Sequence, residues 1–509
     1  MIPEIISHPL SLAPVARNAM AGKPDARYAS RPHGRDAWLE HARSVNASSR
    51  DDWFQRLEAA IQPTGEAESR LRRAADADGF VITTGQQPGL FGGPIYTLSK
   101  ALSALALANA LEKLTGIPVA PVFWAATDDT DFREAAKVTV ALPGGPRELV
   151  MDARGPVGAP MAEMPFGDLS PLLEELRAAC GSAADLRVTD LVAKAYAAPA
   201  TVGRAYVRFL RELLAPLGIS VLDASHEAVR AASLPLLTSA LEKSDDIAKA
   251  IAANNAAIHT DGFDLQVQDV AGLSLVFEKT ASGRKRIPRK RGTSGVNASS
   301  DLGPNVLLRP VVERYILPTA AYVGGPAEIA YFAQLGPIAD TLGVPRPLIV
   351  PRWSCTIVEE HVRQLLDKIG IGIDDLRDPH AAETRVAREN LPEALQREVA
   401  SLRLSLEERA SSLAAASATS DPIVGRAVVE GLRHNIEHRL DRFERRLVAA
   451  WKRKNADLIY EIATARGSLF PFGKLQERAL SFVPFLARYG TRLQDAMLDS
   501  ASEHARSLL

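Results

Sequence analysis

Hydrophobic positions along the chain first follow a strand pattern, then a helix pattern, and this alternation recurs. Residues 80–83 form a short apolar run, and residues 95–114 carry leucine and alanine at helical spacing. Residues 119–125 form a continuous apolar run typical of a buried strand. Strand, helix and strand within about 45 residues predict a βαβ unit, and therefore a parallel sheet.

The same alternation continues further along the chain. A helix is predicted over residues 206–217 and a short strand over 219–223. A strand at 322–323 then runs through a glycine–proline turn into a helix predicted over 327–342, and a strand follows at 348–350. The fold class is therefore α/β, with a parallel sheet as its core.

Two less regular stretches, about 142–200 and 227–304, interrupt the alternation and read as insertions that cap the sheet. The second contains the basic run 283–292, with six basic residues in eight. A solvated loop is the simplest interpretation of this run. No aromatic residues interleave with it to stack on bases, which argues against a nucleic-acid patch. A mobile basic loop that closes over an anionic substrate is the remaining interpretation.

After residue 359 the apolar positions become sparse and heptad-like. Leucine and valine recur at steps of three and four over 395–413 and again over 429–447, with Asp421-Pro422 between the two arms. The proline break predicts an antiparallel helical hairpin. An isolated hairpin of this kind leaves apolar surface exposed, so we expect a homodimer.

Composition narrows the classes of function. The chain has 509 residues, 46% of them apolar, and a formal net charge of −1, so no global charge favours nucleic acid or a membrane surface. The only cysteines are Cys180 and Cys355, which excludes a disulfide scaffold and a cysteine-rich zinc site. We expect no secretion signal, and the sequence contains no apolar run of about 20 residues. We expect a cytoplasmic protein without a resident metal site.

The turn at residues 84–94 joins the first strand to its helix and contains four glycines. Unpaired N–H groups at such a helix start, together with the helix dipole, attract phosphate or carboxylate. Lys100 lies roughly 9 Å along the helix axis and leans back toward this turn. An equally good interpretation is a tight connection that merely needs glycine. The candidate binding residues of this segment are Thr84, Gly85, Gln86, Gln87, Gly92, Gly93 and Tyr96.

A second turn, Gly324-Gly325-Pro326, also leads from a strand into a helix. Two such helix starts suggest a shared crevice at the carboxyl ends of the strands, where open α/β sheets bind ligands. Nearby, Arg309 suits a carboxylate or phosphate. Glu328 suits either a helix cap or a cationic amine. The candidate binding residues of this region are Asn305, Arg309, Gly324, Gly325, Glu328 and Tyr331.

An acidic cluster follows the strand at 119–125. Asp128, Asp129 and Asp131 lie within four residues, shortly after Trp124, which we also take as a binding residue. Carboxylates this close repel one another in a buried site, so an amine, Mg²⁺ or an arginine must compensate them. The interpretation without a functional role is a solvated acidic turn. The apolar strand before the cluster favours a site.

Together these motifs resemble the cysteine ligase family of bacillithiol biosynthesis, and the resemblance spans nearly the whole chain in order. The matching residues are Thr84-Gly85-Gln86-Gln87-Pro88-Gly89-Leu90, Gly93-Pro94, Lys100, Pro121-Val122-Phe123-Trp124, Asp129, Asp131-Phe132, Asn305, Arg309-Pro310, Gly325-Pro326, Glu328-Ile329-Ala330-Tyr331, Pro351-Arg352, Pro471, Gly473, Leu475-Gln476-Glu477-Arg478 and Tyr489-Gly490.

The resemblance implies a Rossmann-like core related to nucleotidyltransferases and class I synthetases. It also implies two connecting insertions and a C-terminal α-helical antiparallel coiled coil that dimerises. We therefore expect core segments at 1–141, 205–226 and 305–359. The insertions are expected at 142–204 and 227–304, and a helical domain with its tail at 360–509.

The reaction that the resemblance implies joins the carboxylate of cysteine to the amine of glucosaminyl malate. ATP would activate the carboxylate, with ADP as another expected nucleotide and Mg²⁺ as an accompanying ion. Asp129, Asp131 and Lys100 are the expected catalytic residues, and either of the two aspartates would hold the amine and accept its proton. Arg309 or the basic run would receive the malate carboxylates.

Two departures from the family pattern bear on this chemistry. Thr130 stands where the family commonly has a histidine, and a threonine hydroxyl cannot act as a base near neutral pH. Gln86 and Gln87 stand where related synthetases carry a histidine-rich signature. Two other functions stay open at this point. One is a non-catalytic anion- or nucleotide-binding scaffold dimerised by its coiled coil. The other is a nucleotidyltransferase or ATP hydrolase acting on another sugar.

Overall fold

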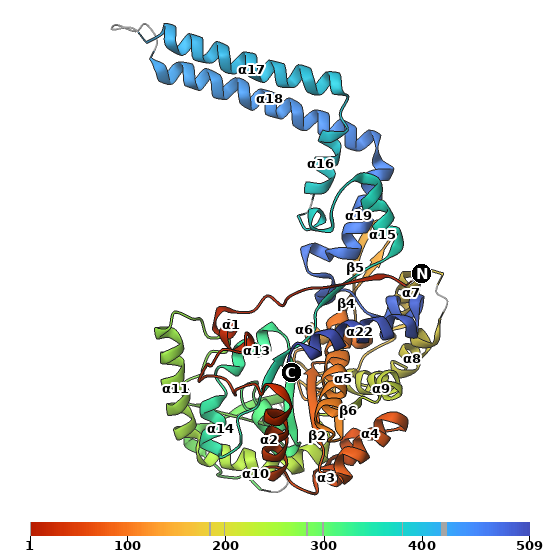
Figure 1. Cartoon of the computed structure of the whole chain (residues 1–509), viewed down its shortest axis with the longest axis vertical. Coiled ribbons are helices and arrows are strands. Elements are labelled where there is room, and N and C mark those ends of the chain that lie inside the picture. Colours follow the sequence, from red (N-terminus) through yellow and green to blue (C-terminus); the bar gives the residue numbers. More distant parts are fainter. Residues whose placement is uncertain are drawn as a thin grey trace. The chain divides into compact units, whose positions relative to one another are not determined.

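The computed structural model of the chain describes residues 2–182, 185–197, 199–280, 283–297, 300–378, 380–418 and 425–509. It divides into two compact units (Figure 1). The first comprises Met1–Val140, Arg147–Val358 and Gln476–Leu509. The second comprises Ala141–Pro146 and Glu359–Leu475.

The core of the first unit is a five-stranded sheet in which every pair of neighbouring strands is parallel. The predicted α/β class with a parallel sheet is therefore confirmed. In spatial order the strands are β11 (Ile349–Pro351), β10 (Thr319–Gly324), β2 (Phe80–Gln86), β3 (Val119–Ala125) and β6 (Ser220–Asp223).

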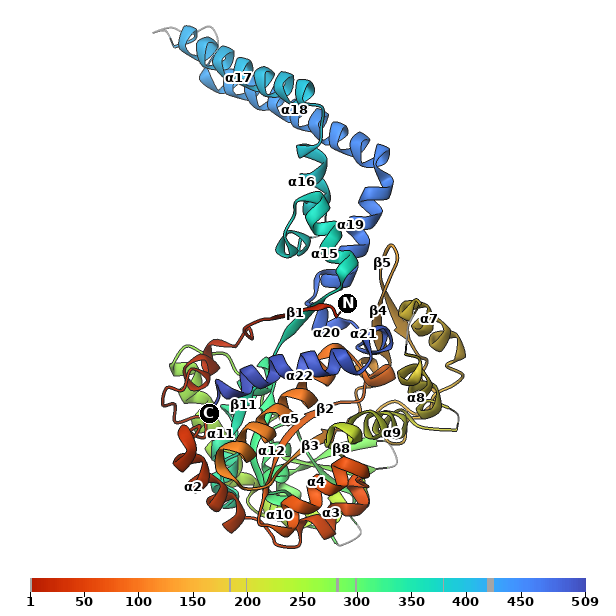
Figure 2. The ribbon, with the colours of Figure 1, turned by 45° about the vertical axis from the view of Figure 1, so that its right-hand side comes forward.

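Helices cover both faces of this sheet, and they bury the predicted apolar runs. The helix α5 (Ile95–Thr115) packs on β2 and β3 and is buried on most sides, which explains its many leucines and alanines. It ends at Gly116, which adopts a left-handed conformation with φ of 77°. The helices α3 (Trp53–Ile61), α4 (Gly65–Asp76) and α10 (Glu227–Glu242) contribute to an apolar cluster that includes Val81, Val122 and Trp124. The ribbons of these three helices are seen in Figure 2.

Two local predictions are corrected. The helix predicted over 327–342 is two helices, α13 (Pro326–Phe332) and α14 (Gly336–Leu342), because Pro337 begins a new helix rather than continuing the first. The basic run is not a loop over most of its length. It forms the strand β8 (Gly283–Pro288), paired with β7 (Leu273–Thr280) in an antiparallel three-stranded sheet completed by β9 (Leu302–Pro304).

The C-terminal tail, residues 476–509, belongs to the first compact unit. The helix α22 (Thr491–Arg506) packs along α5. The short helix α20 (Gln476–Ala479) is fixed by Glu477, which accepts two hydrogen bonds of 2.7 and 2.6 Å from Arg352. These long-range contacts attach the tail to the core.

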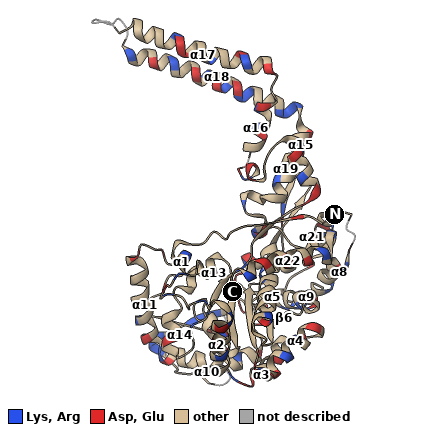
Figure 3. Cartoon of the chain, viewed as in Figure 1, with Lys and Arg blue, Asp and Glu red and all other residues tan. Residues whose placement is uncertain are grey.

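The second unit contains the predicted helical hairpin, formed by α17 (Glu393–Ala416) and α18 (Arg426–Lys454). Arg403 on α17 bonds to Asp441 and Glu444 on α18, whereas Glu407 pairs with Arg433, so the two helices run antiparallel. Basic and acidic positions are interspersed along both helices (Figure 3). The expected break at Asp421-Pro422 lies outside the described residues. None of the described helices combines the length and apolar composition that a bilayer crossing requires.

Candidate active site

A cavity of about 630 Å³ lies in the first unit, bordered by residues at the carboxyl ends of β2, β3 and β10. This is the position at which parallel α/β sheets bind ligands. Most of the residues expected from the sequence line it. They are Gly85, Gln86, Gln87, Tyr96, Lys100, Asp128, Asp129, Asn305, Arg309, Gly325, Glu328 and Tyr331.

The two glycine turns meet through Lys100 and Glu328. The Lys100 Nζ lies 2.5 Å from Glu328 Oε2 and donates hydrogen bonds to the Gly85 carbonyl and Gln86 Oε1, so its three N–H groups are all engaged. Glu328 also accepts from the Gly325 N–H at 2.8 Å and from the Tyr322 hydroxyl. Although burial opposes ionisation, Lys100 and these donors lower the pKa of Glu328 below its ordinary value. Lys100 therefore stabilises the site electrostatically, without an N–H group left for direct contact with a ligand.

The expected anion cradle at Gly92 and Gly93 is corrected by the hydrogen bonds around it. The Gly92 N–H reaches the Gly89 carbonyl and the Tyr196 hydroxyl, and the Gly93 N–H reaches the Leu90 carbonyl. The first N–H of α5, at Ile95, donates to the Leu480 carbonyl at 2.8 Å. A Cβ on Gly92 would lie 2.5 Å from the Phe209 ring, so glycine here serves close packing.

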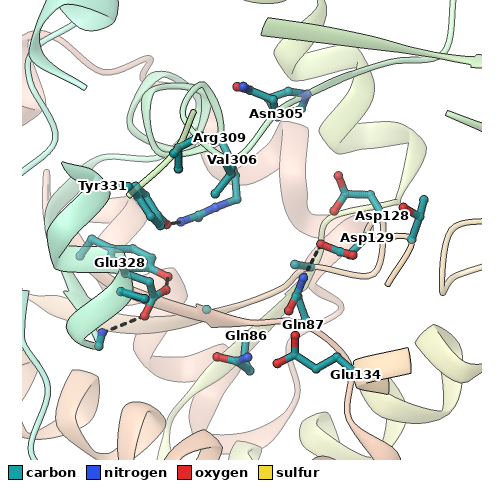
Figure 4. A pocket seen from close by; sticks show the side chains of 18 of the residues that line it. Gln86, Gln87, Asp128, Asp129, Glu134, Asn305, Val306, Arg309, Glu328 and Tyr331 are labelled. Carbon is teal, nitrogen blue, oxygen red and sulfur yellow. Dashed lines mark hydrogen bonds between the residues drawn. The ribbon is translucent and has the colours of Figure 1, made fainter. Parts of the chain in front are cut away.

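Asp129 is the best positioned of the expected catalytic carboxylates. The Gln87 side-chain amide donates to Asp129 Oδ2 at 2.6 Å, and the Asp131 N–H donates to Oδ1 at 2.7 Å (Figure 4). Asp131 itself caps the short helix α6 (Phe132–Ala135) by accepting from the Glu134 N–H. It is exposed and is not among the residues lining the cavity.

Two further carboxylates flank Asp129. Burial raises the pKa of Asp128, while Arg284 opposes this by donating to both its carbonyl and its carboxylate. Glu134 stands at the rim of the cavity (Figure 4). The residue is exposed overall, but partial desolvation of its carboxyl group, together with Asp131 and Asp129, raises its pKa. This wall of the cavity suits a cationic or amine-bearing ligand.

Arg309 faces the acidic wall from the opposite side of the cavity (Figure 4). Its guanidinium donates to Glu313 at 2.7 Å and to the Tyr331 hydroxyl at 3.2 Å, and it stacks 5.0 Å from the Tyr322 ring centroid. Burial alone would lower the pKa of Arg309, but these three neighbours raise it well above its ordinary value. Arg309 thus gives the side of the cavity opposite the acidic wall a permanent positive charge.

Several expected residues lie away from this cavity. Thr84 is buried and donates to the Val323 carbonyl, and Gly324 packs so closely that a Cβ would meet Ile349 at 2.6 Å. Trp124 instead lines a second cavity of about 390 Å³, which shares Asp128 and Arg284 with the first.

The cavity also contains residues that our site prediction missed. Arg352 and Arg478 belong to motifs that carry the family resemblance, and Glu134 follows the acidic cluster within one helical turn, so each had a sequence signal. Arg284 and Arg286 were hidden in the basic run, and Tyr322 in a buried strand. Among the described residues, no group of three or more His, Cys, Asp or Glu side chains is arranged to hold a metal ion.

Comparison with known proteins identifies the family. The model for the N-terminal Rossmann-like domain of bacillithiol biosynthesis BshC matches residues 18–300 and 295–353, and the model for its C-terminal coiled-coil domain matches residues 355–507. A Solibacter usitatus (strain Ellin6076) protein named "Putative cysteine ligase BshC" is 33% identical over 87% of this chain and 86% of its own length. Proteins of the same name from Koribacter versatilis (strain Ellin345) and Salinibacter ruber (strain DSM 13855 / M31) are each 30% identical, over 88% and 84% of this chain and 86% and 82% of their own lengths. The chain therefore belongs to the BshC family of bacillithiol biosynthesis.

Proposed function

We propose that this protein is an amide-forming ligase that joins the carboxylate of cysteine, or of a similar amino acid, to the amine of glucosaminyl malate. The relatives' name supports the amino acid. The observation that carries the proposal is the acidic wall of Asp128, Asp129 and Glu134, which faces the cationic wall of Arg309 across one cavity. Such a cavity suits an amine and an anionic group in one reaction complex.

A free carboxylate is a poor acyl donor, so we assign ATP as the co-substrate that activates it. One carboxylate oxygen of cysteine would leave with the phosphoryl or adenylyl group that it acquires. The positive charge of Lys100 and Arg309 would offset the charge that develops in the cavity. Because the N–H groups of Gly92, Gly93 and Ile95 are engaged, side chains rather than the start of α5 would receive the phosphates.

Mg²⁺ would enter with ATP, because this ion is held mainly by substrate phosphates and needs only one or two protein carboxylates.

On the amine side, Asp129 would orient the incoming neutral amine, since Gln87 and the Asp131 N–H fix the Asp129 carboxylate. Glu134 would accept the proton that the amine loses as the C–N bond forms and the leaving group departs. Its raised pKa suits a base that works closer to neutral pH than an ordinary glutamate. Thr130 also lines the cavity, but its hydroxyl cannot perform this step.

We further propose a cytoplasmic homodimer that associates through α17 and α18. Apolar side chains remain exposed along this hairpin, including Leu432, which is 50% exposed, and Ile436, four residues later. Such a stripe on a helical pair is typical of a coiled-coil interface.

The test of the ligase is direct. Purified protein is incubated with cysteine, glucosaminyl malate and ATP, and the thiol product is sought by mass spectrometry. We expect product that depends on all three substrates. Absence of product with cysteine and with the other amino acids, despite bound substrates, would contradict the proposal and favour a non-catalytic scaffold. ATP turnover without an amino acid would favour a nucleotidyltransferase or hydrolase.

A further inference from the structure

The arginines of the cavity differ sharply in how far the protein already uses them. Arg284, Arg309 and Arg352 each have an acidic partner within the chain. Arg284 also donates to the Pro304 carbonyl and lies 4.9 Å from the Phe277 ring centroid. Each of these arginines already has a counter-charge within the protein, so a ligand anion would gain less from it than from an arginine without one.

Arg286 lines the same cavity but has no such partner. Its Nε donates to the Ser274 carbonyl at 2.8 Å, which fixes the side chain. Its Nη2 is buried, and none of the described residues accepts a hydrogen bond from it. Burial lowers the pKa of Arg286, and Asp269 offsets this only in part; the two residues form no ion pair within the described part of the chain.

The strand geometry explains why Arg286 reaches the cavity. Arg286 stands opposite Phe277 in the β7–β8 ladder, and side chains at opposite positions share a face of the sheet. Arg284, two residues earlier, shares this face, whereas Lys285 between them points to the other face and is exposed. Phe277, Arg284 and Arg286 all line the cavity, and Lys285 does not.

A buried guanidinium N–H without an acceptor is costly, and an anionic ligand oxygen removes that cost. The position of Arg286 on β8 indicates which group of the ligand would supply this oxygen. The same face of β8 contacts Asp128 through Arg284, and Asp128 adjoins Asp129, to which the proposed function assigns the amine. An acceptor whose amine lies at Asp129 would therefore extend its acidic end toward β8.

We infer that Arg286 binds a carboxylate of the amine-bearing substrate, and so selects an acceptor with a dicarboxylate end. The inference rests on the proposed function for the orientation of the acceptor. Of the two candidates for this role, it selects the basic run over Arg309, because Arg309 is engaged with Glu313 and Tyr331 whereas the Arg286 Nη2 has no acceptor among the described residues.

The experiment measures binding without turnover, by calorimetry on the full chain. The probes are glucosaminyl malate, methyl glucosaminide without the malate group, and ATP. Arg286→Met removes the charge, Arg286→Lys keeps the charge but loses the planar fork, and Lys285→Met on the opposite strand face is the matched control. Melting temperatures report whether each variant folds. If Arg286→Met does not fold, the comparison of Arg286→Lys with the wild type is the test.

We expect Arg286→Met to weaken glucosaminyl malate binding roughly tenfold to hundredfold. Arg286→Lys should weaken it less, and Lys285→Met should leave it unchanged. Binding of methyl glucosaminide and ATP should not respond to Arg286. Equal glucosaminyl malate affinity in the wild type and the folded Arg286 variants, a loss confined to ATP, or no binding by the wild type would overturn the inference. Arg286-dependent binding without any product would instead retain the inference and contradict only the ligase function.

Discussion

Lys100 on α5 and Glu328 on α13 form a largely buried ion pair with an Nζ–Oε2 distance of 2.5 Å. The pair joins the helices that follow the two glycine turns, and it lies beside the neighbouring strands β2 and β10. Residues at both helix starts line one cavity, as expected, but Lys100 is already paired with a carboxylate of the protein.

Replacing Glu328 by Gln should destabilise the first unit by about 3 kcal/mol, because the buried Lys100 would lose its counter-charge. The measurement is the free energy of unfolding from urea denaturation. The double variant Glu328→Gln/Lys100→Met should recover part of the loss, since it removes the unpaired charge as well. A loss in the double variant equal to the sum of the losses in Glu328→Gln and Lys100→Met would contradict the coupling.

The same pair makes a pH prediction. The folded-state pKa of Glu328 lies below its ordinary value of 4.5, so its contribution to stability is present above about pH 4.5 and is lost as pH falls through the folded-state pKa. The wild type should lose more stability than Glu328→Gln over that acid range. Parallel acid unfolding profiles for the two proteins would show that Glu328 contributes nothing to this dependence.

The sequence pattern predicted those helices and strands that are marked by an uninterrupted run or a regular spacing of apolar residues. The run Val119–Ala125 forms the strand β3 with the predicted bounds, because a central parallel strand is apolar on both faces. It could not predict β8, since charged residues and a proline there carry a weak strand signal and only pairing with β7 and β9 defines the strand.

The site was harder to predict because long-range partners decide what each residue can do. The Ile95 N–H looked free for an anion, yet the Leu480 carbonyl far along the chain takes it. Asp128, Asp129 and Arg309 line the cavity as expected, since strand ends gather at one edge of a parallel sheet, whereas Asp131 does not.

Replacing Glu134 by Gln should lower the rate of amide formation roughly 100-fold, the usual effect of losing a positioned base. In the wild type, kcat/KM should fall as pH decreases toward the raised pKa of Glu134, and this decline should begin above pH 4.5, the ordinary glutamate value. The decline should be absent from Glu134→Gln. Asp129→Asn serves as the comparison, because it should slow the reaction while retaining the same acid limb. A wild-type acid limb in Glu134→Gln would exclude Glu134 as the base.

The buried pair of Arg352 and Glu477 should hold the C-terminal tail on the core. Glu477→Gln leaves Arg352 without its counter-charge, so we expect a loss of about 3–5 kcal/mol and faster amide hydrogen exchange in α22. The control is Asp340→Asn, which breaks the exposed pair with Arg346 and should cost less than about 1 kcal/mol. Similar small losses in both variants would contradict a role for Arg352 and Glu477 in attaching the tail.

Charged substitutions on the exposed stripe of α18 should separate the dimer. Leu432→Glu combined with Ile436→Glu places two carboxylates where the proposed interface is apolar. Sedimentation should show a dimer for the wild type and a monomer for this variant. The control is His438→Glu on the same helix. Because His438 lies outside the apolar stripe, this variant should remain a dimer. A monomeric wild type would contradict this assembly.

The central claim is that this cavity forms an amide from an activated amino-acid carboxylate. The most direct measurement supplies cysteine with both carboxylate oxygens labelled with ¹⁸O, together with glucosaminyl malate and ATP, and follows the label by mass spectrometry. The account predicts one ¹⁸O in the amide product and the other in the released phosphate or AMP. Unlabelled phosphate and AMP, or turnover of ATP with no labelled amide, would contradict it.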